Sequence, residues 1–424
     1  MMTLVCTDCF GNKGLQRRIE EIRPQFPDEK CDFHPSKKGI PITEVAEIVD
    51  PVFRNEYTHG YYDHHYDDYA GDNLSGTLYE LTEAHDDQVV NSLSDALKDG
   101  DNYYIPDGED AFYSDDVTYT SNTEGYEERS HTWRLFCSSI LHEQRFFNQK
   151  ALNRLNEIFD GLHLLQDSKR RPAVYTIEPN SAFSLFFRSR KARSTSDRER
   201  IAKNPAKELG PPPEGLRRAG RMNPSGILTF YGAFDLDTCV AELRPAVGES
   251  VISAQFSLTR PILVLDTTQF SGKPKAENIF SSNHIEKMRL WKFMTQFMHE
   301  ISKPSLPDDE HLDYIPTQVV SEYLSQIHKM KVIDQENKID AIIYKSAQNE
   351  KGKNIAIFGA AAEVKEGPRI FNTLYSSNPA LTIVKSSLVS HDVVSVTYSK
   401  GEVFTPTFND EDNNGNRNYD ELPF

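Results

Sequence analysis

The chain has 424 residues, with 64 acidic and 47 basic side chains and a formal net charge of −17. This length suits two or three domains, each with its own hydrophobic core. The acidic balance argues against nucleic acid as a main partner but permits a local basic site. Residues 1–15 lack a signal-peptide core, and no apolar run approaches the roughly 20 residues of a membrane helix. We therefore expect a cytoplasmic protein without a membrane partner.

The first 40 residues contain two closely spaced pairs of metal-ligand side chains. Cys6 and Cys9 are separated by two residues, as are Cys31 and His34. This spacing lets both side chains of a tight turn point at one ion, and such donors suit structural Zn²⁺. Four protein ligands would leave no open position for catalysis. We predict a zinc-ribbon-like unit over residues 1–40, with reduced cysteines and no metal as the alternative.

Residues 41–170 are predicted to form a mainly helical module. Helices are expected at 43–50, from Pro51 to about His59, within 78–97 and within 132–165, whereas 99–128 is predicted to be a loop. Arg54 and His59 have the spacing of a HEPN ribonuclease motif, in which His is a base and Arg stabilises a phosphorane. The structural alternative is a helix end, where His59 and Gly60 are both favoured.

From residue 171 the pattern changes to strands with a few helices, which indicates an α+β domain over 171–400. The expected strands are 174–177, 183–187, 227–231, 252–258, 262–265, 339–344 and 355–358, and the expected helices are 235–243, 283–302 and 317–330. Residues 192–215 are predicted to form a flexible, lid-like loop that three prolines stiffen at its end. The acidic, Asn-rich residues 401–424 are predicted to be a mobile tail.

An ordered set of polar side chains borders these expected strands. Arg188 and Arg221 each flank an apolar run, where a guanidinium can form a bidentate fork with a diphosphate. Tyr231 closes a strand and can line a flat base, and Glu242 follows in a short helix. A carboxylate in that position can stabilise a ribose carbon that becomes cationic. The order of Arg, aromatic and Glu therefore suits a dinucleotide.

These residues resemble the motifs of the RES domain, a family named after its recurring Arg, Glu and Ser. Residues 220–226, Gly-Arg-Met-Asn-Pro-Ser-Gly, are similar to its glycine-arginine-x-asparagine-x-x-glycine signature. Phe230-Tyr231 and Ala241-Glu242 resemble its tyrosine and its alanine-glutamate pair, and Ser346 lies in a segment similar to its last block. Phe187-Arg188 resembles the arginine that opens the domain. The resemblance spans roughly residues 183–396.

The resemblance implies an ADP-ribosyltransferase-like fold and cleavage of NAD⁺ at the nicotinamide bond. It also implies site residues in two groups: NAD⁺ is bound by Arg188 and Asn223, and the reaction centre comprises Arg221, Tyr231, Glu242 and Ser346. No His or Lys lies at a spacing from Ser346 that suggests a catalytic pair. We therefore expect Ser346 to donate a hydrogen bond to the ribose or to the nicotinamide amide and not to be a nucleophile. Some relatives carry a short zinc unit and a HEPN-like helical segment before the RES domain.

The main hypothesis is an NAD⁺ glycohydrolase or phosphorylase that releases nicotinamide, with the role of a bacterial toxin or defence effector. One alternative is transfer of ADP-ribose to a macromolecule, and another is an RNA-binding or RNA-cleaving N-terminal module. No antitoxin domain is recognisable in the chain. We therefore expect control by an antitoxin or other regulatory protein, by homo-oligomerisation or by the N-terminal module.

Overall fold

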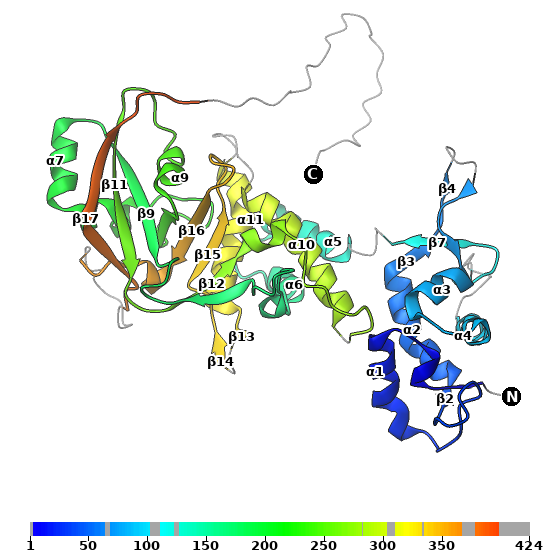
Figure 1. Cartoon of the computed structure of the whole chain (residues 1–424). Coiled ribbons are helices and arrows are strands. Elements are labelled where there is room, and N and C mark those ends of the chain that lie inside the picture. Colours follow the sequence, from blue (N-terminus) through cyan, green and yellow to red (C-terminus); the bar gives the residue numbers. More distant parts are fainter. Residues whose placement is uncertain are drawn as a thin grey trace, which may run out of the picture.

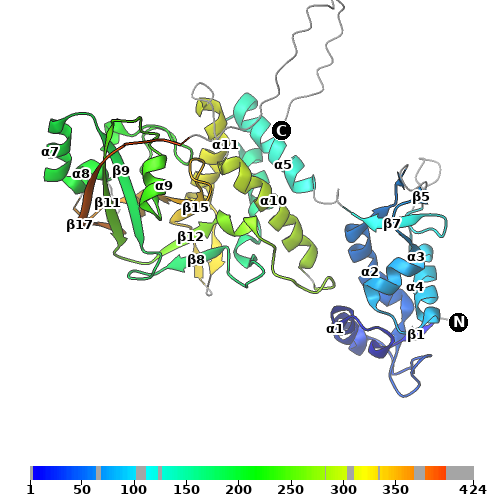
Figure 2. The ribbon, with the colours of Figure 1, turned by 45° about the horizontal axis from the view of Figure 1, so that its top comes forward.

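The computed structural model describes residues 3–63, 68–101, 111–122, 127–281, 283–302, 310–332, 335–366 and 378–397. The predicted tail at 401–424 lies outside these residues. The chain forms two lobes, shown from two sides in Figures 1 and 2: an N-terminal lobe up to residue 122 and a larger C-terminal lobe from residue 127. Among the described residues, no helix combines the length and apolar character needed to cross a membrane.

The N-terminal lobe packs four helices around one apolar core. They are α1 (Lys13–Ile22), α2 (Ile42–Glu56), α3 (Leu74–Thr82) and α4 (Asp87–Gly100). A small sheet of β3 (Tyr57–His59), β7 (Thr118–Ser121) and β6 (Asp72–Asn73) lies beside them, and β1 (Leu4–Val5) pairs with β2 (Ile40–Pro41). The hairpin β4 (Tyr62–Asp63) and β5 (Asp68–Tyr69) completes the strands described for this lobe.

Two local predictions for this lobe are wrong. Pro51 lies inside α2 and does not begin a second helix, and His59 lies in β3 instead of at a helix end. The apolar face of α2 explains the unbroken helix, because Val49, Val52 and Phe53 on either side of the proline are all buried. Their packing outweighs the hydrogen bond that proline cannot donate.

The C-terminal lobe is built on an eight-stranded mixed sheet with the order β17-β11-β9-β10-β16-β15-β12-β8. The strands are β8 (Val174–Ile177), β9 (Leu185–Ala192), β10 (Thr229–Ala233), β11 (Ser250–Leu258), β12 (Ile262–Asp266), β15 (Ala341–Lys345), β16 (Lys353–Phe358) and β17 (Leu381–Asp392). Neighbours are antiparallel except β12 and β15, which are parallel. The predicted α+β class is confirmed.

Alternation along the central strands gives the sheet two apolar faces. Ile342 and Ala356 belong to one core, whereas Ile343 and Ile355 belong to the other. Helices α5 (Glu127–Ser138), α6 (Gln149–Phe159), α10 (His284–Ser302) and α11 (Glu310–Glu322) contribute to the first core. Although α5 and α6 fall within the predicted module 41–170, their apolar residues pack against α10 in this C-terminal core.

The second core corrects the prediction of a flexible lid at 192–215. This segment folds into α7 (Thr195–Lys203) and α8 (Pro205–Leu209). Ile201 and Leu209 are buried in the core with strands β9 and β11. Helix α7 is polar except for Ile201, its single buried side chain. One apolar residue gives almost no helical periodicity in the sequence, so the helix could not be predicted.

The two lobes meet at the segment that precedes α10. Phe280 is buried in the core of the N-terminal lobe, although it belongs to the chain between β12 and α10. Asn278 Nδ2 donates a hydrogen bond of 2.8 Å to Asn12 Oδ1, which also caps α1. An added Cβ at Gly14 would lie 1.6 Å from Asn278 Oδ1. The absence of a side chain at Gly14 therefore permits this close approach.

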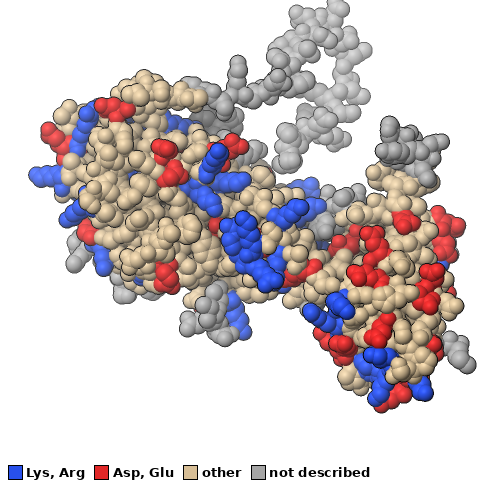
Figure 3. Space-filling view, viewed as in Figure 1, with Lys and Arg blue, Asp and Glu red and all other residues tan. Residues whose placement is uncertain are grey.

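Charge is unevenly divided between the lobes. Residues 1–126 carry 27 Asp and Glu against 9 Lys and Arg, whereas the remaining residues carry 37 against 38. Figure 3 shows the acidic side chains gathered on the N-terminal lobe and prominent basic side chains on the C-terminal lobe. The net charge of the chain therefore belongs to the N-terminal part, and residues 127–424 taken together are close to neutral.

Candidate active site

A cavity of about 510 Å³ lies where α9 (Leu236–Ala241) and the C-terminal end of α10 approach β9, β10 and β16. This volume lies in the range of roughly 300–1,000 Å³ that is typical of small-molecule sites. Four of the predicted site residues line it: Arg188, Arg221, Tyr231 and Glu242. The fold thus brings together side chains that are up to 54 positions apart in the sequence.

Glu242 follows the last residue of α9, and its carboxylate is fixed by two donors. Ser346 Oγ and Asn354 Nδ2 each donate a hydrogen bond of 2.6 Å to Glu242 Oε1. Oε2 has no hydrogen-bond partner within the part of the chain that the structure describes. The arrangement therefore presents an oriented carboxylate at the cavity.

Ser346 is buried and acts on the cavity through Glu242. Its hydroxyl donates to the carboxylate and accepts hydrogen bonds from the backbone N–H groups of Gln348 and Asn349, at 3.1 and 3.0 Å. The hydroxyl proton is thereby directed at Glu242 and not at a ligand. Ser346 is a positioning residue in this structure, and its predicted bond to ribose or nicotinamide remains a prediction.

Two arginines supply positive charge to the cavity. Arg188 lies on β9, where its guanidinium donates to the Tyr231 carbonyl at 2.9 Å and lies 4.8 Å from the centroid of the Phe230 ring. Burial lowers the pKa of Arg188 to about 10, so the side chain is still charged at neutral pH. Arg221 lies over the Tyr314 ring at 4.9 Å, and among the described residues its guanidinium forms no hydrogen bond or ion pair. Arg221 is therefore available to an anionic ligand.

Helix α11 holds the loop that carries Arg221. Thr317 Oγ1 donates to the Arg221 carbonyl at 2.6 Å, and Gln318 Nε2 donates to the Gly220 carbonyl at 2.8 Å. An added Cβ at Gly220 would lie 2.7 Å from the Tyr231 hydroxyl. A glycine is therefore needed where the loop passes this tyrosine.

Asn223 and Tyr231 organise the same loop from inside. The Tyr231 hydroxyl donates to Asn223 Oδ1 at 2.7 Å and accepts from the Met222 N–H at 3.0 Å. Asn223 Nδ2 donates to the carbonyls of Arg218 and Pro224 at 3.1 and 2.9 Å. Burial raises the pKa of Tyr231 well above its usual value, so its hydroxyl stays protonated. The contacts of Asn223 are those of a loop-forming residue, and its binding of NAD⁺ remains a prediction.

Three lining or supporting residues were not among the predicted site residues. Asn354 lies on β16, Tyr344 lies on β15, and Tyr314 lies on α11 beneath Arg221. A single Asn inside the apolar strand 353–358 is the only local sequence signal for Asn354. The cavity lining also contains Arg244 and Lys345, so four cations surround one carboxylate among the lining residues.

The predicted zinc ligands lie together in the N-terminal lobe. The Sγ atoms of Cys9 and Cys31 are 3.5 Å apart, and His34 Nδ1 lies 3.5 Å from Cys6 Sγ and 3.4 Å from Cys9 Sγ. All four ligand atoms lie within 4.8 Å of one another. Zinc bonds of about 2.3 Å to sulfur and about 2.0–2.1 Å to nitrogen place tetrahedral ligand atoms roughly 3.6–3.8 Å apart. The donor set and its spacing therefore fit one tetrahedral metal ion.

Arg54 and His59, the residues of the HEPN-like spacing, are both engaged in internal contacts. Arg54 forms ion pairs with Asp50 at 2.7 Å and with Asp101 at 2.5 Å. His59 Nε2 lies 2.8 Å from the Phe112 carbonyl oxygen, and its ring stacks on the Phe112 ring. These contacts favour a structural role for both residues, although His59 lies in β3 and does not end a helix.

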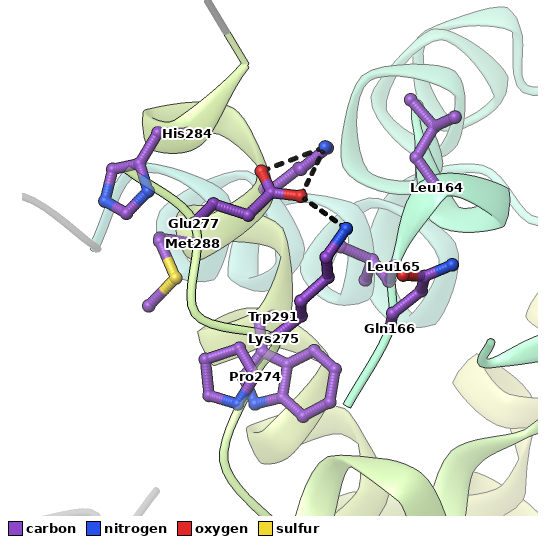
Figure 4. Close-up of a pocket in the computed structure, with 10 residues that line it drawn as sticks. Leu164, Leu165, Gln166, Pro274, Lys275, Glu277, His284, Met288 and Trp291 are labelled. Atoms are coloured by element: carbon purple, nitrogen blue, oxygen red, sulfur yellow. Dashed lines mark hydrogen bonds and ion pairs between the residues drawn. The ribbon is translucent and has the colours of Figure 1, made fainter. Parts of the chain in front are cut away.

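Figure 4 shows a different, much smaller hollow, beside the first turns of α10. Its volume is about 20 Å³, which is room for roughly one water molecule. Glu277, at its edge, accepts hydrogen bonds from Lys287 and lies 3.5 Å from Lys275 Nζ, as the dashed lines in Figure 4 indicate. The paired charges and the small volume make this a structural feature and not a ligand site.

The fold and the site define an α+β domain with a cation-lined cavity that contains one oriented carboxylate. Residues 193–375 match the family model of the RES domain. The C-terminal lobe therefore contains a RES domain, which relates the protein to NAD⁺-processing enzymes. The match covers less than half of the chain and begins shortly after Arg188. Searches of curated proteins and of solved structures gave no match.

Proposed function

We propose that the protein cleaves the bond between nicotinamide and ribose in NAD⁺. The observation that supports this most directly is the Glu242 carboxylate, fixed by Ser346 and Asn354 in a cavity whose other charged lining residues are all cations. Cleavage of this bond places positive charge on the ribose carbon, and a preorganised carboxylate stabilises that charge. Nicotinamide leaves as a neutral molecule from a cationic ring, so no strong general acid is needed.

In this mechanism the remaining side chains bind and orient the substrate. Arg221 and Arg188 bind the diphosphate, and Tyr231 lies on the nicotinamide side of the cavity. Ser346 and Asn354 keep one oxygen of Glu242 occupied, so the other is directed to the ribose. The acceptor of the ribosyl group is water or inorganic phosphate.

The function is tested by incubating the purified protein with NAD⁺ and following free nicotinamide, ADP-ribose and ADP-ribose 1''-phosphate. A glycohydrolase gives ADP-ribose in any buffer, whereas a phosphorylase gives the 1''-phosphate only when phosphate is present. Labelled protein and RNA in parallel reactions detect transfer of ADP-ribose to a macromolecule. Failure to release nicotinamide with or without phosphate would exclude the proposal.

We also propose that Cys6, Cys9, Cys31 and His34 bind one Zn²⁺ with a structural role. The four ligands occupy all positions of a tetrahedral ion, and the N–H groups of Cys6 and His34 donate to ligand sulfurs, each at 3.4 Å. Such secondary hydrogen bonds orient ligands in metal sites. The site lies in the N-terminal lobe, away from Glu242, so it supplies stability and not chemistry.

A further inference from the structure

A second cavity of about 290 Å³ adjoins the candidate active site. The two cavities share Arg188, Ala219, Gly220 and Tyr231 as a common wall. An elongated ligand that occupies both must therefore pass the guanidinium of Arg188. If the nicotinamide half lies beside Glu242 and the diphosphate at the arginines, the second cavity is where the adenosine half lies.

The lining of the second cavity suits a flat base. Leu216 and Ile227 both line it, although they are 70% and 53% exposed. Large apolar side chains that remain this exposed beside a cavity gain free energy when an aromatic ring covers them. Pro212 adds a third apolar surface to the same lining. This cavity therefore offers apolar surfaces on which a flat base can lie.

The charged side chains that line this cavity are all arginines. Arg217 donates to the Pro212 and Gly226 carbonyls, each at 3.2 Å, which fixes its guanidinium against the loop. The exposed side chain of Arg218 makes no hydrogen bond or ion pair with any residue whose placement is described. The lining contains no carboxylate.

The charge of this cavity indicates which group it can accept at the 2'-position of the adenosine ribose. In Rossmann-fold enzymes, an Asp or Glu bonds the 2'-hydroxyl of NAD⁺, whereas an Arg accommodates the 2'-phosphate of NADP⁺, and the same chemistry applies to a ribose in any site. A carboxylate accepts a hydrogen bond from the hydroxyl and repels the phosphate. The second cavity has the opposite charge, because its lining contains three arginines, Arg188, Arg217 and Arg218, and no acidic side chain.

We propose that the second cavity binds the adenosine half of the dinucleotide and that Arg218 binds the 2'-phosphate, so that NADP⁺ is a substrate as well as NAD⁺. This inference rests on the proposed function, because the placement of the nicotinamide half beside Glu242 sets the direction of the ligand. Arg218 is the specificity-determining residue, and Arg217 supports it from a fixed position.

The test compares nicotinamide release from NAD⁺ and from NADP⁺ by the full chain, the Arg218→Gln variant and an Arg193→Gln control. Arg193 is an exposed arginine of the same lobe that lines neither cavity. We expect the wild-type protein to use NADP⁺ with a kcat/KM at least equal to that for NAD⁺. Arg218→Gln should lower the ratio of kcat/KM for NADP⁺ to that for NAD⁺ at least tenfold, and Arg193→Gln should leave this ratio unchanged.

The outcomes separate the two proposals. Cleavage of neither dinucleotide overturns the proposed function. Cleavage of NAD⁺ alone, or an NADP⁺/NAD⁺ ratio that Arg218→Gln does not change, overturns the inference and leaves the proposed function intact. Binding to the Glu242→Gln protein gives a second readout without turnover. There, 2',5'-ADP should bind more tightly than 5'-ADP, and equal binding would contradict the role of Arg218.

Discussion

At the scale of single residues, the site depends on one carboxylate oxygen that is bonded twice. Ser346 and Asn354 both donate to Glu242 Oε1, and both donor residues are buried. Neither donor can bond a ligand with the same hydrogen. The chemistry is therefore expected to reside in Glu242, and the two neighbours are expected to affect its orientation.

Glu242→Gln should lower the rate of nicotinamide release by at least about 100-fold, the scale found when one electrostatic group of an active site is removed. The amide oxygen can still accept from Ser346 and Asn354, so the thermal unfolding temperature should stay the same. The variant should also relieve any toxicity on expression. Wild-type turnover by this variant would contradict the proposed mechanism.

Ser346→Ala should reduce kcat by roughly 10- to 100-fold, because a hydrogen bond to a charged group contributes about 1.5–3 kcal/mol. KM for NAD⁺ should change little, since the hydroxyl is directed at Glu242 and not at the ligand. The measurement is steady-state kinetics of nicotinamide release, with Ser346→Thr as the variant that keeps the hydroxyl. A large rise in KM with unchanged kcat would show that Ser346 contacts the substrate.

Arg221→Lys should be almost as harmful as Arg221→Ala, because an ammonium group lacks the planar fork that binds a diphosphate at two points. An ammonium group would also lose the flat contact with Tyr314. Binding of NAD⁺ to Glu242→Gln protein that carries either change measures the effect without turnover. Nearly full binding with lysine would show that residue 221 acts only as a positive charge.

At the scale of elements, the conformation of the loop 218–227 depends on hydrogen bonds from the Asn223 side chain. An isosteric substitution at this position can disrupt them. Asn223→Asp keeps the shape but places an acceptor against the carbonyls of Arg218 and Pro224. We expect a loss of about 1–3 kcal/mol in the free energy of unfolding, the range for an unsatisfied buried polar group. Denaturant unfolding measures this loss. Unchanged stability together with weaker NAD⁺ binding would favour the predicted binding role of Asn223.

The elements differed in how far they could be predicted from sequence. Central strands such as β15 and β16 are apolar on both faces, so a run of Ile and Ala gives a strong signal. Helix α7 buries only Ile201, and its polar residues resemble a loop. The continuity of α2 across Pro51 depends on packing that no local pattern displays.

The residues of the candidate site could also be predicted only where a local motif was present. Arg221, Tyr231 and Glu242 lie close together in the chain, so their order could be recognised as a motif. Asn354 lies 112 residues after Glu242 and reaches it only because β16 pairs with β10. A side chain that is brought to a site by strand pairing has no local sequence motif that would identify it.

At the scale of the whole molecule, the acidic N-terminal lobe carries the Cys3His cluster for which we propose a zinc ion. Metal analysis should find about one zinc per chain, and Cys6→Ser combined with Cys9→Ser should lose it. The N-terminal lobe of this double variant should unfold at a lower temperature, as measured by calorimetry. Ser substitution of Cys137, which lies outside the cluster, is the matched control. A metal-free protein of full stability would contradict a structural site.

Helix α10 touches both lobes. Its first residue, His284, lies 3.8 Å from Glu56 of the N-terminal lobe, and its last residues, Ile301 and Ser302, line the candidate active site. A helix of 19 residues spans about 28 Å at 1.5 Å per residue and bends little over that length. The helix therefore connects the N-terminal lobe directly to the cavity wall. We expect a tilt of the N-terminal lobe to displace Ile301, while Glu242, which follows α9, need not move.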